Sequence, residues 1–246
     1  MISASIMSKK IAEGTSSLVL DVKTGAGAFM KTFADSLALA ETMVGIGTAA
    51  GVNTVALITD MDAPLGRSAG NGLEVAESVD VLAGGGPADV VELTVALARE
   101  MLACAGIDTD PAEVLASGRA MDTWHAMIRA QGGDPDAPLP VARHTEDVVA
   151  PADGYLVGMD AMAVGLSAWR LGAGRAAQGD PVQAAAGVTW HAGLGDRVRA
   201  GQPLFTLHTD TPERMERGLA ALTDAVTIAD APVERRPLVL ERISAG

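Results

Sequence analysis

Apolar positions in the first half of the chain follow two spacings, one typical of helices and the other of buried strands. Helical spacing begins at residue 2 and ends before Gly14, and two short β-rich apolar runs come later. Because a strand, a helix and a second strand follow one another, this half favours a parallel α/β sheet. The predicted elements are a helix at 2–13, a strand at 16–22, a helix at 35–50 with Asp35 as its candidate N-cap, and a strand at 53–60.

The pattern changes after residue 131. Helical spacing continues to that point, and the following segment QGGDPDAPLP concentrates Gly, Pro and Asp, which is typical of a linker. Beyond it, alternating apolar positions and glycine turns predict several strands with short helices, so we expect a smaller α+β domain. The predicted division is an α/β domain at 15–131, a linker at 132–143 and a C-terminal domain at 144–246.

Glycine-rich loops follow both predicted strands of the parallel sheet. They lie at residues 23–31, which include KTGAGAFM, and at residues 61–77. Open α/β sheets bind ligands at the carboxyl ends of their strands, and parallel strands bring those ends to one edge. We therefore expect a ligand site near these two loops.

Composition narrows the classes of partner. A formal charge of −13 and a pI near 4.6 argue against nucleic acid and anionic membrane surfaces, because both need a basic face. The single cysteine, Cys104, cannot form an internal disulfide. No stretch of the sequence has the roughly 20 apolar residues of a membrane span, and the first residues, MISASIMSKKIAEG, lack the features of an export signal. We expect a cytoplasmic protein with soluble partners.

Ser5 and Lys9 lie four residues apart on the first predicted helix, so their side chains project from one face. An ammonium and a hydroxyl together suit a planar polar group that presents carbonyl oxygens and an N–H, such as a pyrimidine edge. On the spacing alone, an ordinary solvated helix face is the stronger interpretation.

Two further groups of residues are candidates for binding. In the first loop, glycines could let backbone N–H groups approach a ligand, but a simple turn is the stronger interpretation of them. Phe29 in the same loop could equally form an apolar wall or belong to the core. In the second loop, the carbonyl oxygens of Leu65 and Ser68 and the carboxylate of Glu77 suit a hard cation, although the residues alone give this reading little support. The histidines have neither the spacing nor the cysteine partners of a zinc site, and no G-x-S-x-G elbow is present.

Four segments, in order and approximate spacing, resemble the thymidine phosphorylase family of pyrimidine nucleoside phosphorylases. They are ASIMSKKIAEG, LVLDVKTGAGAFM, TDMDAPLGRSAGNGLEVAES and LGAGR, and the resemblance spans nearly the whole chain. It implies reversible phosphorolysis of thymidine, or another pyrimidine deoxynucleoside, to the free base and 2-deoxyribose 1-phosphate. It also implies a homodimer in the full-length form, inorganic phosphate as co-substrate and no organic cofactor.

The resemblance assigns roles to the candidate residues. The serine and lysine of the family's S-x-x-x-K helix contact the base and match Ser5 and Lys9, with Lys9 stabilising the departing base. The phenylalanine of G-A-F-M lines the base pocket and matches Phe29. Some members bind a monovalent or calcium cation at positions that match Leu65, Ser68 and Glu77.

Other family features do not occur in this sequence. The resemblance implies a longer N-terminal helical domain, a K-H-S-T-G-G phosphate-binding stretch and a base-binding arginine upstream of the S-x-x-x-K helix. We therefore expect residues 1–14 to be a remnant of the helical domain and the chain to be a truncated, inactive piece. Three explanations of the truncation are a truncated gene model, an expressed fragment and a protein that is itself shortened.

Of three other interpretations, the carrier function is excluded by composition and two stay open. GDRVRAGQPLFTL resembles the hammerhead of biotinyl and lipoyl carriers, but the chain has no lysine after Lys31 for their attachment. A related transferase such as anthranilate phosphoribosyltransferase also handles a ribosyl C1′, although the hammerhead and the P-L-G loop favour the nucleoside phosphorylase. A non-catalytic remnant that pairs with a full-length phosphorylase is the third.

Overall fold

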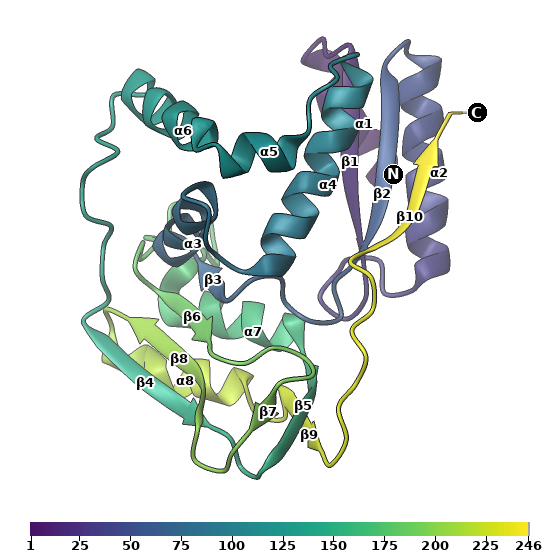
Figure 1. The fold of residues 1–246 in the computed structure, drawn as a ribbon. Helices are drawn as coiled ribbons and strands as arrows, with labels where there is room; N and C mark the ends of the chain where they lie inside the picture. The colour runs from purple at the N-terminus through teal and green to yellow at the C-terminus, as the bar shows by residue number, and fades with distance from the viewer. Residues whose placement is uncertain (246) are drawn as a thin grey trace.

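The predicted strands 16–22 and 53–60 form the centre of the first region in the computed structural model, which describes residues 1–245 (Figure 1). They pair in parallel from Ser17 opposite Asn53 to Thr24 opposite Asp60, and the helix between them packs on the sheet. The predicted parallel α/β arrangement is therefore confirmed. The elements are α1 (Ile2–Ala12), β1 (Ser17–Thr24), α2 (Phe33–Ala49) and β2 (Asn53–Asp60).

The start of α2 differs from the prediction that Asp35 is its N-cap. Thr32 is the N-cap, with extended backbone, and its hydroxyl oxygen accepts a hydrogen bond from the Asp35 backbone N–H at 3.2 Å. The Thr32 hydroxyl in turn donates to the Asp35 carboxylate at 2.7 Å. Asp35 thus lies in the first turn, where its charge is favourable beside the unpaired N–H groups of the helix end.

A short strand and four helices follow β2. Figure 1 shows α4 beside β1, while α5 and α6 extend away from the sheet toward α3. The predicted succession of helices up to residue 131 is confirmed. These elements are β3 (Ser68–Gly70), α3 (Gly72–Leu82), α4 (Ala88–Cys104), α5 (Pro111–Ala116) and α6 (Arg119–Ala130).

The second region contains two small antiparallel sheets and two helices. One sheet has the strand order β3-β6-β8-β4 and the other β7-β5-β9. The expected smaller α+β domain is present. Its own elements are β4 (His144–Val149), β5 (Gly154–Met159), α7 (Ala161–Ala168), the π-helical turn η1 (Trp169–Ala173), β6 (Gly187–Trp190), β7 (Arg197–Val198), β8 (Pro203–Thr209), the 3₁₀ turn η2 (Pro212–Arg214), α8 (Met215–Ala221) and β9 (Val226–Ala229).

The two regions exchange strands, so their sheets do not follow the division at 132–143. β3 leaves the first region and pairs with β6. In the other direction, the chain returns after β9 and its last strand, β10 (Val239–Ser244), pairs antiparallel with β2. Each of these two sheets therefore has at one edge a strand that the sequence did not predict there. The segment 230–238 crosses from the second region back to the first (Figure 1).

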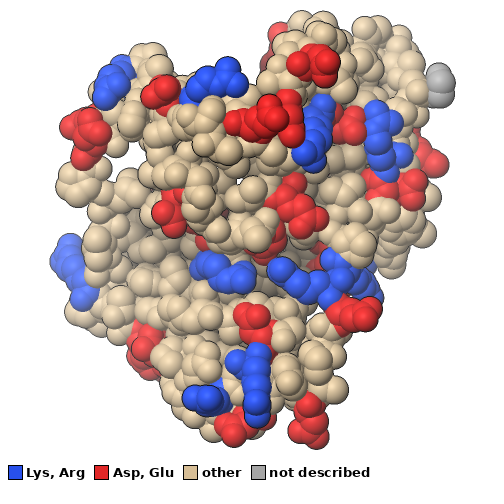
Figure 2. Space-filling model, viewed as in Figure 1, with Lys and Arg blue, Asp and Glu red and all other residues tan. Residues whose placement is uncertain are grey.

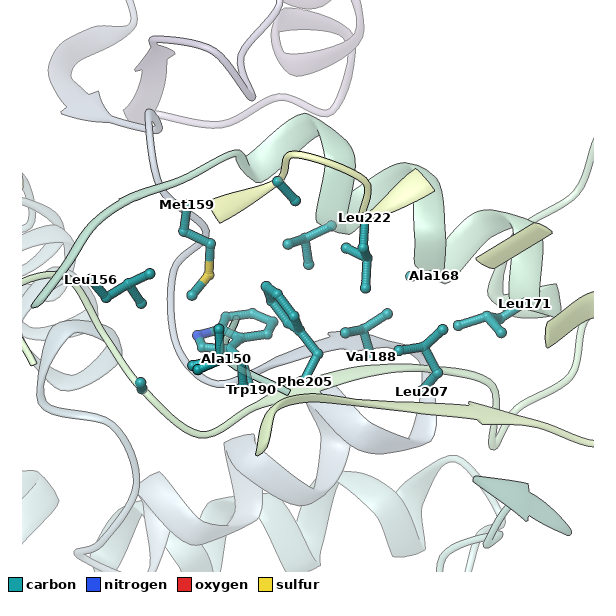
Figure 3. Packing of buried hydrophobic residues seen from close by; sticks show 14 of the residues in the cluster. Ala150, Leu156, Met159, Ala168, Leu171, Val188, Trp190, Phe205, Leu207 and Leu222 are labelled. Atoms are coloured by element: carbon teal, nitrogen blue, oxygen red, sulfur yellow. The ribbon is translucent and has the colours of Figure 1, made fainter. Parts of the chain in front are cut away.

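Each region has its own hydrophobic core. In the second region, Phe205 and Trp190 pack against Val188, Leu207 and the facing helices, and all of these side chains are buried (Figure 3). The first region has a smaller cluster, in which Met7 of α1 packs with α2 and one face of the sheet. None of the helices within residues 1–245 is both long and apolar enough to cross a bilayer.

Candidate functional site

The loops that follow β1 and β2 lie against each other at the carboxyl edge of the sheet. The Gly27 N–H donates to the Met61 carbonyl at 2.9 Å, and the Ala26 N–H donates to Asp62 Oδ1 at 2.9 Å. Gly25 has φ of +119°, and a Cβ there would lie 2.6 Å from Asp62 Oδ1. The glycines therefore allow a tight turn and a close contact between the two loops. The N–H groups of Ala26 and Gly27 already donate hydrogen bonds within the protein.

Phe29 is an exposed residue of the first loop. Its side chain is 80 % exposed, whereas the neighbouring Ala28 is buried. This exposure excludes the alternative that Phe29 belongs to the core. An aromatic ring held beside the carboxyl edge of the sheet can form an apolar wall for a planar ligand.

Ser5 and Lys9 share the exposed face of α1, opposite Met7, which has no exposed surface. Within residues 1–245, neither of the two side chains takes part in a hydrogen bond or ion pair, whereas the adjacent Lys10 pairs with Glu13 at 3.3 Å. The hydroxyl and the ammonium are therefore free to bind a ligand. The structure gives no contact between this pair and Phe29.

A polar network that the sequence reasoning missed lies on the sheet itself. Lys23 Nζ is 2.6 Å from Asp21 Oδ2 and 3.1 Å from Thr59 Oγ1, and the Thr59 hydroxyl donates to Asp21 Oδ1. Thr59 is completely buried, and the two charged side chains are mostly buried. The sequence signal for this network is the spacing of Asp21 and Lys23, two residues apart in a mainly apolar strand, which places both side chains on one face of the sheet.

The second loop is tied to α3 by Glu77. One of its carboxylate oxygens, Oε2, accepts the Arg67 backbone N–H at 2.7 Å, and the other lies over Gly66, where a Cβ would be 2.2 Å away. Burial raises the pKa of Glu77 above its ordinary value, although the bond from Arg67 opposes this shift. A cation near the carboxylate would offset the cost of burying its charge.

The surroundings of Glu77 contain an unsatisfied polar atom. Ser68 is 8 % exposed, and its hydroxyl meets no partner at hydrogen-bonding distance and angle in the described chain, although it lies near enough to Glu77 to lower the pKa of that carboxylate by donating to it. Among residues 1–245, no three His, Cys, Asp or Glu side chains converge in a way that could hold a metal. Any cation here would need backbone oxygens in addition to Glu77, and the carbonyls of Leu65 and Ser68 in the same loop fit that requirement.

A cavity of about 120 Å³ lies where the second loop, α4 and the crossing segment 230–238 meet. Arg235 is 3.5 Å from Asp89, whose side chain is only 6 % exposed, and Arg236 is 3.1 Å from Asp62. Burial and the nearby Asp62 raise the pKa of Asp60, which also lines the cavity. Figure 2 shows basic side chains in a row across the middle of this face, where the two regions meet.

Comparisons with known proteins identify relatives along almost the whole chain. Residues 2–126 match the "Glycosyl transferase family, a/b domain" and residues 155–229 the "Pyrimidine nucleoside phosphorylase C-terminal domain". The chain is 54 % identical over 244 residues to the "Thymidine phosphorylase" of Mycobacterium tuberculosis (strain ATCC 25618 / H37Rv), covering 99 % of the chain and 57 % of the relative. It is 39 % identical over 255 residues to the "Pyrimidine-nucleoside phosphorylase" of Staphylococcus aureus (strain USA300), covering 99 % of the chain and 58 % of that relative. The chain thus spans somewhat more than half the length of these relatives.

Proposed function

The chain belongs to the glycosyl transferase family whose a/b domain matches its residues 2–126, and we propose that it serves the reversible phosphorolysis of pyrimidine nucleosides, with thymidine as the first substrate to test. The relatives named thymidine phosphorylase and pyrimidine-nucleoside phosphorylase support this reaction class. The observation that carries the proposal is the exposed Ser5–Lys9 pair on α1, whose side chains have no partner within the described chain.

In the proposed reaction, an oxygen of inorganic phosphate attacks C1′ of the nucleoside and the bond from C1′ to the pyrimidine nitrogen breaks. The bonding electron pair leaves with the base, which becomes an anion or takes up a proton. Lys9 stabilises the charge that develops on the base, and Ser5 supplies one hydroxyl that can both donate and accept. Free side chains on an exposed face are what such a role requires.

Phe29 completes the proposed base site as an apolar wall. Its 80 % exposure leaves the ring available to a planar base. The tight packing of Gly25 and Gly27 against the second loop fixes the backbone on which Phe29 is held. The K-H-S-T-G-G stretch that binds phosphate in the family does not occur among the residues of this sequence, so the proposal assigns no phosphate-binding residue here.

A cation is the second part of the proposal. The carbonyls of Leu65 and Ser68 and the carboxylate of Glu77 would hold a monovalent cation or calcium, which would fix the loop between β2 and α3. The partly buried carboxylate of Glu77, whose pKa is raised by burial, supports this assignment, because a cation would offset the cost of burying its charge. Potassium or calcium should raise the Tm of the protein, and Glu77→Gln should remove that rise; an equal rise in the variant would contradict the site.

We also propose that the protein acts in the cytoplasm and as a homodimer. The acidic composition and the single cysteine support the first assignment, and the family resemblance supports the second. Light scattering of the protein measures the second directly.

The test of the proposed reaction is a chimera in which this chain replaces the matched segment of the Mycobacterium tuberculosis relative. At 54 % identity, the replaced segment should fold in its new context. We expect thymine release from thymidine that depends on phosphate, with the unaltered relative as the positive control. A folded chimera that releases no thymine would favour the alternative of a non-catalytic remnant.

A further inference from the structure

Arginines in this acidic chain divide into two groups. Seven of the fourteen arginines have a carboxylate within 4.0 Å, and the other seven have none in residues 1–245. Three of the second group, Arg170, Arg214 and Arg217, line one cavity in the second region. What distinguishes these three is that their guanidinium groups gather at one cavity of a chain whose net charge is −13. The paired group consists of Arg67, Arg99, Arg129, Arg143, Arg235, Arg236 and Arg242.

The cavity has a volume of about 260 Å³ and shares no lining residue with the candidate functional site. Its walls come from η1, from the loop after it and from the turn that begins α8. Arg170 Nη1 donates to the Arg217 backbone carbonyl at 3.3 Å, which fixes one guanidinium against the neighbouring helix. Within the described chain, the side chains of Arg214 and Arg217 make no hydrogen bond, so their donors remain free.

The LGAGR segment, to which the proposed function gives no role, shapes this cavity. Gly172 has φ of +120°, and a Cβ there would lie 2.9 Å from Cδ of Gln183 and 3.2 Å from Arg214 Nη1. A Cβ on Gly174 would lie 2.6 Å from Cδ1 of Trp169, whose indole N–H donates to the Arg175 carbonyl at 3.1 Å. The two glycines thus allow a guanidinium and an aromatic ring to pack closely on the backbone.

Asp180 is the acidic residue that lines the cavity, and its carboxylate already accepts hydrogen bonds from the backbone. Its Oδ2 accepts backbone N–H groups from Ala176 at 3.2 Å and from Ala177 at 2.8 Å. The three arginines and this carboxylate leave an excess of positive charge in the cavity, which matches a dianionic phosphate group. Guanidinium groups bind such oxygens in a bidentate way, and the exposed part of Trp169 offers a flat apolar surface beside them.

We propose that this cavity binds the phosphate group of a small phosphate ester, with the organic part of the ligand against Trp169. The volume is slightly below that of typical drug-sized pockets, which suits a ligand of sugar phosphate size. The inference does not depend on the proposed phosphorolysis, since no candidate residue of that site contributes to it.

The experiment labels the tryptophans with 5-fluorotryptophan and follows ¹⁹F resonances while ribose 5-phosphate or inorganic phosphate is added. Trp169→Phe identifies the resonance that reports on the cavity, so binding elsewhere is not counted. We expect a saturable shift of this resonance, with the ester binding more tightly than inorganic phosphate. Arg214→Gln and Arg217→Gln should each weaken binding about tenfold, the loss expected for a hydrogen bond to a charged group.

The matched control is Arg197→Gln with Arg199→Gln, which removes two exposed arginines of the same region that are also without a carboxylate within 4.0 Å. Affinity within twofold of the original chain in this control supports the site. An equal loss in the control, or an equal shift on adding chloride at the same ionic strength, would overturn it. Equal affinity for the ester and for inorganic phosphate would overturn the role of Trp169. Circular dichroism confirms that each variant is folded.

Discussion

The two regions of the molecule bury their side chains in different ways. In the second region, two sheets and two helices enclose a core, so that Leu156, Phe205 and Leu207 are almost completely buried. In the first region, the main cluster around Met7 lies on one face of a three-stranded sheet, and the other face carries the Asp21–Lys23–Thr59 network. The second region encloses its large apolar side chains, whereas the first leaves Lys9 and Phe29 at its surface, where we propose that the base binds.

The largest expected effect contrasts two phenylalanines. Phe205→Ala should lower the free energy of unfolding by about 3–5 kcal/mol, because it leaves a cavity in the enclosed core. Phe29→Ala should change it by less than about 0.5 kcal/mol, because that ring is exposed. Urea denaturation followed by circular dichroism measures both. Similar losses for the two variants would mean that Phe29 is part of a packed core.

A second contrast concerns two adjacent lysines of α1. In the chimera, Lys9→Ala should lower kcat about 10²- to 10³-fold, because it removes the donor that we propose stabilises the departing base. Lys10→Ala is the matched control, since Lys10 pairs with Glu13 and should leave turnover nearly unchanged. Steady-state thymine release gives both values. Full turnover in Lys9→Ala would remove Lys9 from the mechanism.

The junction between the regions should show an intermediate effect. Arg235→Gln should cost about 1–2 kcal/mol of unfolding free energy, because the buried Asp89 would lose its closer cationic partner and retain Arg67 at 3.9 Å. Arg236→Gln should cost less than about 1 kcal/mol, since its pair with Asp62 is well exposed. Thermal and urea unfolding compare the two. A larger loss from Arg236→Gln would reverse this ranking.

The smallest effect is a pH dependence of the second region. Burial lowers the pKa of His208 below its ordinary value of 6.5, so the folded state disfavours the charged ring. The unfolded state binds the proton more readily, and stability should therefore fall as the pH drops through 6.5 and below. Unfolding measured from pH 8 to pH 5 should show less of this loss in His208→Gln. If the stability of His208→Gln depended on pH as strongly as that of the original chain, other groups would be responsible for the loss at low pH.

Local patterns in the sequence predicted much of the first region. The apolar runs located β1 and β2, and the strand–helix–strand order predicted their parallel pairing, because these features depend on neighbouring residues. The exchange of β3 and β10 could not be predicted in this way. A three-residue strand has no period, and the partner of a terminal strand depends on contacts that are distant along the chain.

The candidate site was only partly accessible from the sequence. The spacing of Ser5 and Lys9 alone favours a solvated helix face, and only the family resemblance pointed to a base site there. The exposure of Phe29 and the pairing of Arg235 with Asp89 depend on how loops and regions pack together. No local pattern records those contacts.

The central claim is that the exposed face of α1 binds the pyrimidine base, and lysine amide signals test it most directly. The chain has only Lys9, Lys10, Lys23 and Lys31, so labelling with ¹⁵N-lysine gives four backbone signals to follow while thymine is added. We predict a saturable shift of the Lys9 signal and little change at Lys10. A Lys9 signal that stays in place while others move, or that moves no more than Lys10, would contradict the claim.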